Sequence, residues 1–251
     1  MKGTAQLQER PDTAVRTGDE RAARTGGLAQ RLNALRAGVL GANDGIVSTA
    51  AVVVGVAGAT TAPGPILMAG LAAAIGGAVS MALGEYVSVS SQRDSERHLI
   101  EQERRALAAD PEGELRALAR SYEERGISAA TARRAAEELF ARDALEAQMR
   151  ERHNIDPDEV TSPWHAAVAS FLAFAVGALL PLLAILLPAP DLRVPVAFGA
   201  TLLGLAATGA VAAGIGGGSQ VRAAVRVTVG GALALAATYL IGSLVGASGI
   251  V

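Results

Sequence analysis

The chain has no cysteine, which excludes disulfide bonds, thiolate metal sites and cysteine nucleophiles but leaves the redox compartment open. It also has no lysine or arginine between Arg36 and Arg93. Its net charge is small, −2 at neutral pH, and gives no support for nucleic-acid binding. The N-terminal residues are polar and lack the short apolar core of a signal peptide. We therefore interpret residues 1–35 as a cytoplasmic, disordered tail.

Apolar residues and basic residues are strongly segregated along the chain. Hydrophobic residues make up 51% of the total. Of the 22 basic residues, seven lie in residues 1–36 and twelve in residues 90–163. A soluble helical bundle would instead distribute its charges along every helix. Because about 20 apolar residues suffice to cross a bilayer, the sequence predicts five membrane-spanning helices, at residues 37–58, 65–89, 164–187, 194–215 and 225–244.

A polar block, residues 90–163, separates the second predicted span from the third. Its composition predicts three helices, the first of which continues the second span. Asp110-Pro111 predicts a helix start, because Asp is a favoured N-cap and Pro is favoured at the first helical position. That second helix is expected to end at Gly126, and a third is expected to be capped by Ser128 and to run to about His153.

The distribution of basic residues also predicts the orientation, since cytoplasmic loops are enriched in lysine and arginine. The tail, the polar block and the turn holding Arg222 and Arg226 are the basic segments. We therefore expect the N-terminus and the polar block on the cytoplasmic side and the C-terminus outside. The expected fold is an all-α integral membrane bundle of five transmembrane helices, two in residues 36–89 and three in 164–251, with a cytoplasmic three-helix insertion.

Asp44 and Glu85 are acids inside the long apolar stretches. A carboxylate at membrane depth costs roughly 2.5 kcal/mol or more, so a functional role is the default hypothesis. Asp44 follows Arg36 by eight residues and Glu85 precedes Arg93 by eight. In antiparallel helices both acids would lie roughly 12 Å from the cytoplasmic face. Met81 lies one turn before Glu85 on the same helix face.

Two carboxylates suit a hard divalent cation, and a thioether adds a softer contact, so this set favours Fe²⁺ or Mn²⁺ over Mg²⁺ or Ca²⁺. The competing interpretation is structural. Asp44 would cap an irregular helix start, Glu85 would snorkel to the membrane interface, and Met81 would be a core residue.

Small residues recur along both of the first two predicted spans. Gly41 and Gly55 belong to such a stripe on the first span, and Gly70 and Gly77 to one on the second. Small residues at this spacing let membrane helices approach closely. We expect these faces at the twofold axis of a homodimer, which would double the number of metal ligands.

Two segments, Gly41–Ser48 (GANDGIVS) and Ser80–Ser88 (SMALGEYVS), resemble the signature stretches of the vacuolar iron transporter family. The resemblance covers roughly residues 28–248 and is to a bacterial-type member. It implies a five-span homodimer in membrane lipid that exports Fe²⁺, and often Mn²⁺, from the cytosol in exchange for protons. It implies no prosthetic group and no enzymatic activity.

The resemblance also implies where the metal passes. Asp44 and Met81 match residues of the family's translocation path, which lies at the dimer axis between the first and second spans. A further acid of some members falls on Ala73 here. Glu85 would supply that charge from one turn beyond Met81.

The family's cytoplasmic helices carry glutamates and a methionine that collect metal before transport. Ala106 and Ala117 stand where two further acids are expected, and Arg152 interrupts the last part of the cluster. The alternative is that the acids of this block form solvated faces and surface ion pairs. Four residues of the block match or lie near the family's metal ligands: Glu103, Glu114, Met149 and Glu151.

Three functions compete at this point. The first is a proton-coupled divalent metal transporter. The second is a membrane scaffold or metal sensor whose cytoplasmic insertion binds a partner without transport. The third, an intramembrane enzyme, is disfavoured because the sequence offers no catalytic set. The similar depth predicted for Asp44 and Glu85 favours the first, since a scaffold has no need for two acids there.

Overall fold

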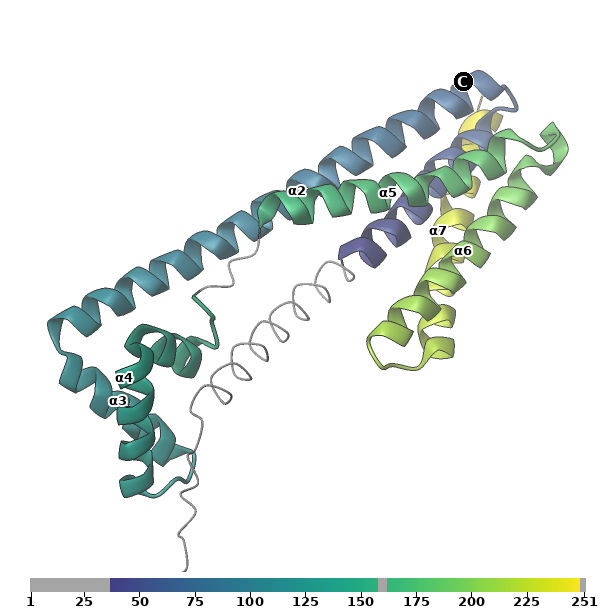
Figure 1. Ribbon diagram of the computed structural model, residues 1–251. Coiled ribbons are helices and arrows are strands. Elements are labelled where there is room, and N and C mark those ends of the chain that lie inside the picture. Colours follow the sequence, from purple (N-terminus) through teal and green to yellow (C-terminus); the bar gives the residue numbers. More distant parts are fainter. Residues whose placement is uncertain (1–36, 158–161, 249–251) are drawn as a thin grey trace, which may run out of the picture. The chain divides into compact units, whose positions relative to one another are not determined.

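The computed structural model describes residues 37–157 and 162–248, and the predicted tail, residues 1–35, lies outside them (Figure 1). The described residues form helices and no strands. The helices are the first helix (Ala37–Ala59), α2 (Pro63–Ala109), α3 (Pro111–Glu124), α4 (Ala129–His153), α5 (Pro163–Leu186), the short 3-10 helix η1 (Pro190–Leu192), α6 (Arg193–Ile215) and α7 (Gln220–Ala247).

Five of these helices are long and apolar enough to cross a membrane. They are the first helix, α2, α5, α6 together with η1, and α7. Each coincides with one of the predicted spans to within a few residues, apart from the polar extension of α2 and the longer N-terminus of α7. The prediction of an all-α chain with five apolar spans is therefore confirmed.

The polar segment between the second and third spans follows the predicted helix pattern. α2 continues without a break to Ala109, so the second span and the first polar helix are one element. The Asp110 carboxylate caps α3 by accepting a hydrogen bond from the Gly113 N–H at 2.8 Å, and Pro111 occupies the first helical position. Gly126 follows the end of α3 with a φ of 90°, a left-handed conformation that glycine adopts at little cost.

α4 differs from the prediction at two points. Ser128 stands at its N-terminus, but its hydroxyl contacts the Thr131 hydroxyl at 3.0 Å and caps no backbone N–H. Asp143, inside the helix, has the extended angles φ −157° and ψ 105°. Its carboxylate accepts a hydrogen bond from the Glu146 N–H at 2.9 Å, as an N-cap does. α4 is therefore two helical segments, and residues 144–153 form the second.

The contacts divide the chain into two compact units. The first unit comprises residues 1–82 and 168–251, and the second comprises residues 83–167. The first unit has one apolar cluster to which each of the five spans contributes at least one residue. The buried members of this cluster are Ala50, Val53, Val54, Ile66, Leu182, Ile185, Ala197 and Leu235.

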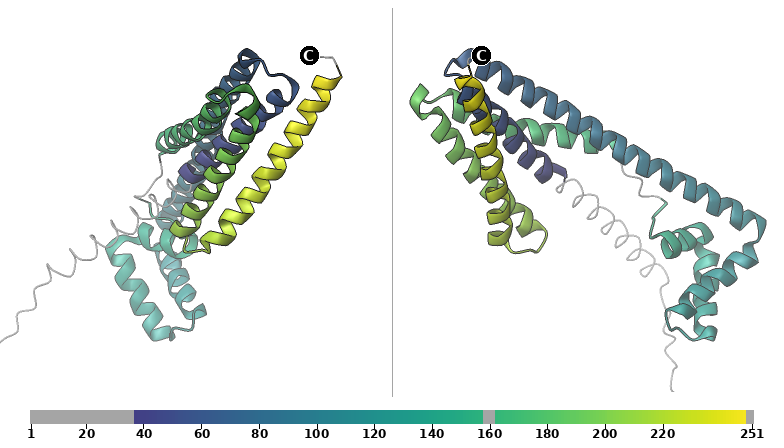
Figure 2. Two further views of the ribbon diagram at one scale, coloured as in Figure 1. Left: turned by 90° about the vertical axis from the view of Figure 1, so that its right-hand side faces the viewer. Right: turned by 180° about the vertical axis from the view of Figure 1, so that it is seen from behind.

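Helices of the first unit approach one another most closely at glycines. A Cβ built on Gly242 of α7 would collide with the carbonyl oxygen of Gly55 in the first helix. A Cβ on Gly209 of α6 would lie 3.1 Å from the Cα of Ala224 in α7, and Figure 2 shows these two helices side by side. Lipid tails are as apolar as the side chains, so close backbone contact is a main source of attraction between the helices.

Gly242→Ala should destabilise the protein because its methyl group would push α7 away from the first helix. Overpacking of this kind costs about 1–3 kcal/mol, which corresponds to a fall of about 5 °C in apparent Tm. Gly230→Ala is the matched control on the same helix, since a Cβ there meets nothing within 4 Å. Thermal unfolding in detergent micelles measures both, and equal Tm values for the two variants would contradict the packing described.

Candidate functional site

Asp44 lies within the continuous helix Ala37–Ala59, so it does not cap a helix start, and that structural alternative is wrong. The residue is half-buried. The Ser48 hydroxyl, one turn later, donates a hydrogen bond to Asp44 Oδ1 at 2.5 Å. The carboxylate is thus oriented by a neutral donor of its own helix.

The helix turn that carries Asp44 is tied to α6 by a polar contact. The Thr208 hydroxyl lies 3.3 Å from Asn43 Oδ1 and 3.1 Å from the Leu205 carbonyl oxygen. A threonine can satisfy its own helix and still reach a neighbour in this way. Nothing in the sequence pattern separates Thr208 from the other hydroxyl residues of the spans, because its role depends on what α6 packs against.

Phe174 of α5 lies against both helices that carry the predicted path residues. A Cβ on Gly45 would collide with the Phe174 carbonyl oxygen, and one on Gly77 would collide with the aromatic ring. Phe174 is 1% exposed. Met81 is half-buried and packs against the cluster formed by Ala78, Phe174 and Ala178. Phe174 is therefore the wedge that spaces the Asp44 helix from the Met81 helix.

Glu85 follows Met81 by one turn on α2 and is half-buried, and it belongs to the second unit, whereas Asp44 and Met81 belong to the first. The next residue, Tyr86, contacts Trp164 with ring centroids 4.9 Å apart. Tyr86 lies just before the polar segment and Trp164 just after it, as expected of residues at a membrane interface.

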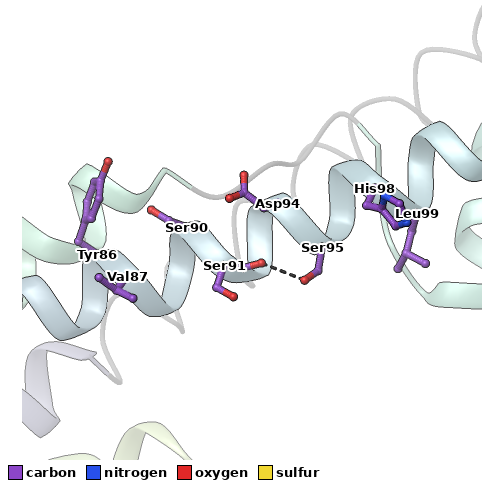
Figure 3. Close-up of a pocket in the computed structure, with 8 residues that line it drawn as sticks. All are labelled: Tyr86, Val87, Ser90, Ser91, Asp94, Ser95, His98 and Leu99. Carbon is purple, nitrogen blue, oxygen red and sulfur yellow. Dashed lines mark hydrogen bonds between the residues drawn. The ribbon is translucent and has the colours of Figure 1, made fainter.

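Beyond Glu85, one face of α2 lines an open hollow of about 680 Å³ (Figure 3). Asp94 and His98 lie one turn apart on this face, and the Ser95 hydroxyl donates to the Ser91 carbonyl oxygen at 3.0 Å. All of the lining residues come from this one helix. The hollow is therefore the open face of a single helix and not an enclosed binding site.

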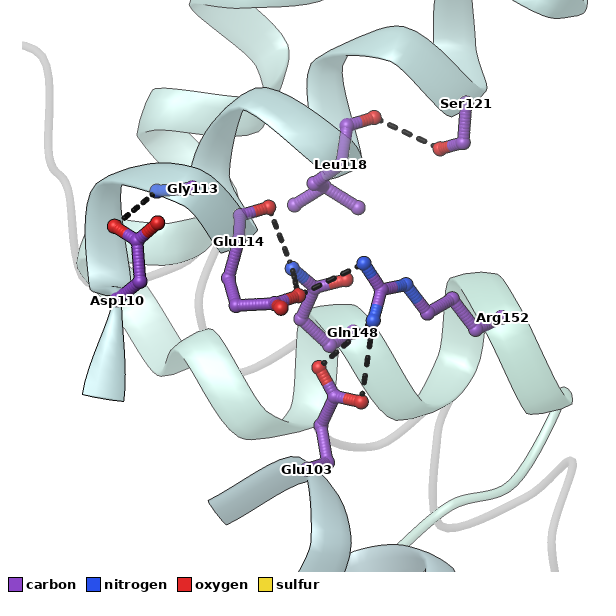
Figure 4. Close-up of polar contacts among 8 residues, drawn as sticks. All are labelled: Glu103, Asp110, Gly113, Glu114, Leu118, Ser121, Gln148 and Arg152. Atoms are coloured by element: carbon purple, nitrogen blue, oxygen red, sulfur yellow. Dashed lines mark hydrogen bonds and ion pairs between the residues drawn. The ribbon is translucent and has the colours of Figure 1, made fainter. Parts of the chain in front are cut away.

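Two of the predicted metal-binding acids of the polar segment meet at an arginine (Figure 4). Arg152 Nη1 lies 3.4 Å from both Glu103 carboxylate oxygens, and Arg152 Nη2 lies 2.8 Å from Glu114 Oε2. The Gln148 amide donates to the Glu114 backbone oxygen at 2.7 Å and also lies 3.3 Å from its carboxylate. Glu103 is 5% exposed, so its charge is neutralised inside the second unit.

Glu151 faces a different partner. Arg125 Nη2 lies 2.7 Å from Glu151 Oε1, and the Glu151 side chain is only 8% exposed. Burial raises the pKa of the Tyr122 hydroxyl, and the nearby Glu151 charge raises it further, while Arg125 opposes this shift. Met149 is fully buried.

The three acids and one methionine predicted to collect metal are thus not arranged as one ligand cluster. Across residues 37–157 and 162–248, no group of three or more His, Asp or Glu side chains is positioned to hold a metal ion. Glu103 and Glu114 share Arg152, whereas Glu151 pairs with Arg125. Metal capture by these residues stays a prediction.

Comparison with known sequences identifies the family of this chain. The sequence model of the VIT family matches residues 35–243. The chain belongs to the VIT family. A vacuolar iron transporter of Acanthamoeba castellanii is 44% identical over 211 residues, which cover 84% of this chain and 78% of the relative.

Two plant relatives agree with this. Vacuolar iron transporter homolog 1 of Oryza sativa subsp. japonica is 37% identical over 242 residues, 95% of this chain and 86% of the relative. Vacuolar iron transporter homolog 2.1 of Arabidopsis thaliana is 32% identical over 220 residues, 87% and 84% respectively. The VIT family consists of transporters, so this chain is an integral membrane metal transporter and not an enzyme.

Phe174→Ala should destabilise the first unit, because removal of a buried ring leaves a cavity between three helices. The expected loss is about 3 kcal/mol or more. Phe171→Ala is the matched control, since Phe171 lies on the same helix and is 38% exposed. Thermal unfolding in detergent should show the larger fall in Tm for Phe174→Ala. A comparable fall in Tm for both variants would contradict the conclusion that the Phe174 ring fills the space between these helices.

Proposed function

We propose that this VIT-family transporter moves Fe²⁺, and also Mn²⁺, out of the cytosol in exchange for protons. The observation that carries the proposal is Asp44, a half-buried carboxylate within a continuous apolar helix, in a segment that resembles the family signature. Its Oδ1 accepts a hydrogen bond from Ser48. A carboxylate has further lone pairs, so Asp44 retains capacity to bind a cation.

The chemistry of the path follows from the two ligand types. Asp44 supplies a hard anionic oxygen and Met81 a soft thioether sulfur, a combination that suits Fe²⁺ and Mn²⁺. Met81 packs beside Phe174, so the wedge holds its thioether on the side of α2 that faces α5. Glu85, one turn further, is proposed as the acid that guides the cation between the path and the cytosol.

Proton exchange has a simple electrostatic reason. An uncompensated carboxylate at membrane depth is costly. When the metal leaves, a proton can neutralise Asp44 in its place, and the next cation displaces that proton. The basic residues of the polar segment favour its position on the cytoplasmic side, with the N-terminus. The same rule places the C-terminus outside, and a bacterial inner membrane is the proposed location.

We also propose that the transporter is a homodimer, with α2 at the interface. Most of the small residues predicted to face the twofold axis instead pack against other helices of the same chain. Gly41 lies against Ala173, and Gly77 lies against Phe174. A second row remains open on α2, where Ala72, Gly76 and Ser80 are all exposed and a Cβ on Gly76 meets nothing within 4 Å. Such a row fits a second copy, and a twofold axis would double the ligands offered by one chain.

Asp44→Asn should abolish metal flux into inverted vesicles or proteoliposomes while leaving expression and Tm near the wild-type values. The carboxamide keeps the shape and the Ser48 contact but removes the charge. Asp191→Asn is the matched control, because Asp191 is exposed on η1, at the very start of the fourth span. Flux is measured for Fe²⁺ and Mn²⁺ with and without a proton gradient. Near-normal metal flux in Asp44→Asn would show that Asp44 is not a metal ligand of the transport path.

Single cysteines at Gly76 or Ser80 should crosslink two protomers in the membrane, since the natural chain has no cysteine to interfere. A cysteine at Leu203 of α6 is the control, because this residue is 73% exposed on another helix. Dimers are scored by gel electrophoresis after mild oxidation. If Leu203→Cys crosslinks and the α2 variants stay monomeric, α2 does not form the interface.

A further inference from the structure

We propose that Arg152 is a built-in cation of the second unit. Its guanidinium occupies the space between the carboxylates of Glu103 and Glu114, so that α2, α3 and α4 are joined without a bound metal ion. This inference is independent of the proposed transport through Asp44. It concerns a site at which the family resemblance predicts bound metal.

The geometry joins three helices through one side chain. Arg152 comes from α4, Glu103 from α2 and Glu114 from α3, and Figure 4 shows the guanidinium lying between the two carboxylates. Its two terminal nitrogens are divided between the acids, at 3.4 Å and 2.8 Å. Such charge-assisted contacts are stronger than neutral hydrogen bonds. Because Glu103 is 5% exposed, its carboxylate needs a counter-charge inside the protein.

A metal ion and this guanidinium exclude each other. Divalent cations bind carboxylate oxygens at about 2.0–2.6 Å. With the Arg152 nitrogens 2.8–3.4 Å from the oxygens of both acids, a cation could bridge Glu103 and Glu114 only after the guanidinium had left. Repulsion between the two cations acts in the same direction.

Gln148 lies one turn before Arg152 on the same face of α4 and reinforces the contact. It is fully buried, and its amide group donates to Glu114 twice. Its Oε1 has no hydrogen-bond partner among the described residues. If Arg152 were removed, two carboxylates and this amide oxygen would remain, which is a ligand set suited to a hard cation.

The Arg152 contact attaches one short helical segment, residues 144–153, to the rest of the second unit. Asp143 breaks α4, so residues 144–153 form their own short helix. Arg152 and Gln148 attach this segment to α2 and α3, and Glu151 attaches it to Arg125. Opening of the segment therefore reports directly on whether the Arg152 contact holds.

Hydrogen–deuterium exchange of the full-length protein in detergent micelles tests the proposal. In metal-free buffer, Arg152→Gln should speed amide exchange in residues 144–153 by about tenfold, the size expected for lost hydrogen bonds to charged groups. Arg152→Lys should lose part of this protection, because one ammonium group replaces two nitrogens. Arg150→Gln is the matched control, since Arg150 forms its ion pairs with Glu146 and Asp156 at the surface.

The second part of the experiment repeats the exchange measurement with Mn²⁺ added. Wild-type exchange in residues 144–153 should be unchanged by Mn²⁺, whereas Mn²⁺ should restore protection to Arg152→Gln. Three results would overturn the proposal: wild-type exchange in Arg152→Gln without metal, failure of Mn²⁺ to protect that variant, or Mn²⁺ protection of the wild type that Glu103→Gln removes. Because exchange is read in residues 144–153, loss of transport through Asp44 would leave this result unaffected.

Discussion

Backbone contact at glycine is the constraint on which the first unit depends. In lipid, burial of apolar side chains no longer separates a packed helix from an unpacked one, so the helices are held by close approach. Gly242 meets the Gly55 carbonyl, and Gly45 meets the backbone of Phe174. The second of these contacts lies next to Asp44 in the chain, and the ring of the same Phe174 lies against Gly77 in the cluster that Met81 packs against. Packing and the candidate metal path are therefore one arrangement.

The acidic side chains of the two units contact different kinds of partner. In the first unit, Asp44 accepts a hydrogen bond from the neutral Ser48 hydroxyl, and we propose that its charge binds a cation or a proton. In the second unit, Glu103 and Glu114 share Arg152, and Glu151 is paired with Arg125. A transported ion must bind and leave, whereas a structural ion pair must stay closed. Among the described residues, the proposed transport acid thus contacts a neutral donor, whereas the acids that join helices contact arginines.

The glycine-rich spans show why small residues alone do not identify an interface. Gly41 and Gly77 follow the same spacing rule as Gly76 and Ser80, yet the first two lie against α5 and the last two are open. The spacing states only that a close neighbour is possible. Which neighbour comes close depends on the rotation of each helix, and that rotation is set by the side chains of the other helices. At Gly77, the close neighbour is the Phe174 ring of α5.

Sequence alone determined the five apolar spans, the three polar helices, the Asp110 cap and the position of Asp44 within an apolar span, because hydropathy, capping and charge are properties of short segments. It also held the motifs that mark the family. Tertiary structure decided the rest: the wedge at Phe174, the contact of Thr208 with Asn43, the break at Asp143 and the pairing of Glu103 and Glu114 with Arg152. Arg152 is 49 residues from Glu103 along the chain. No local pattern brings them together, because that contact exists only once α2, α3 and α4 have packed.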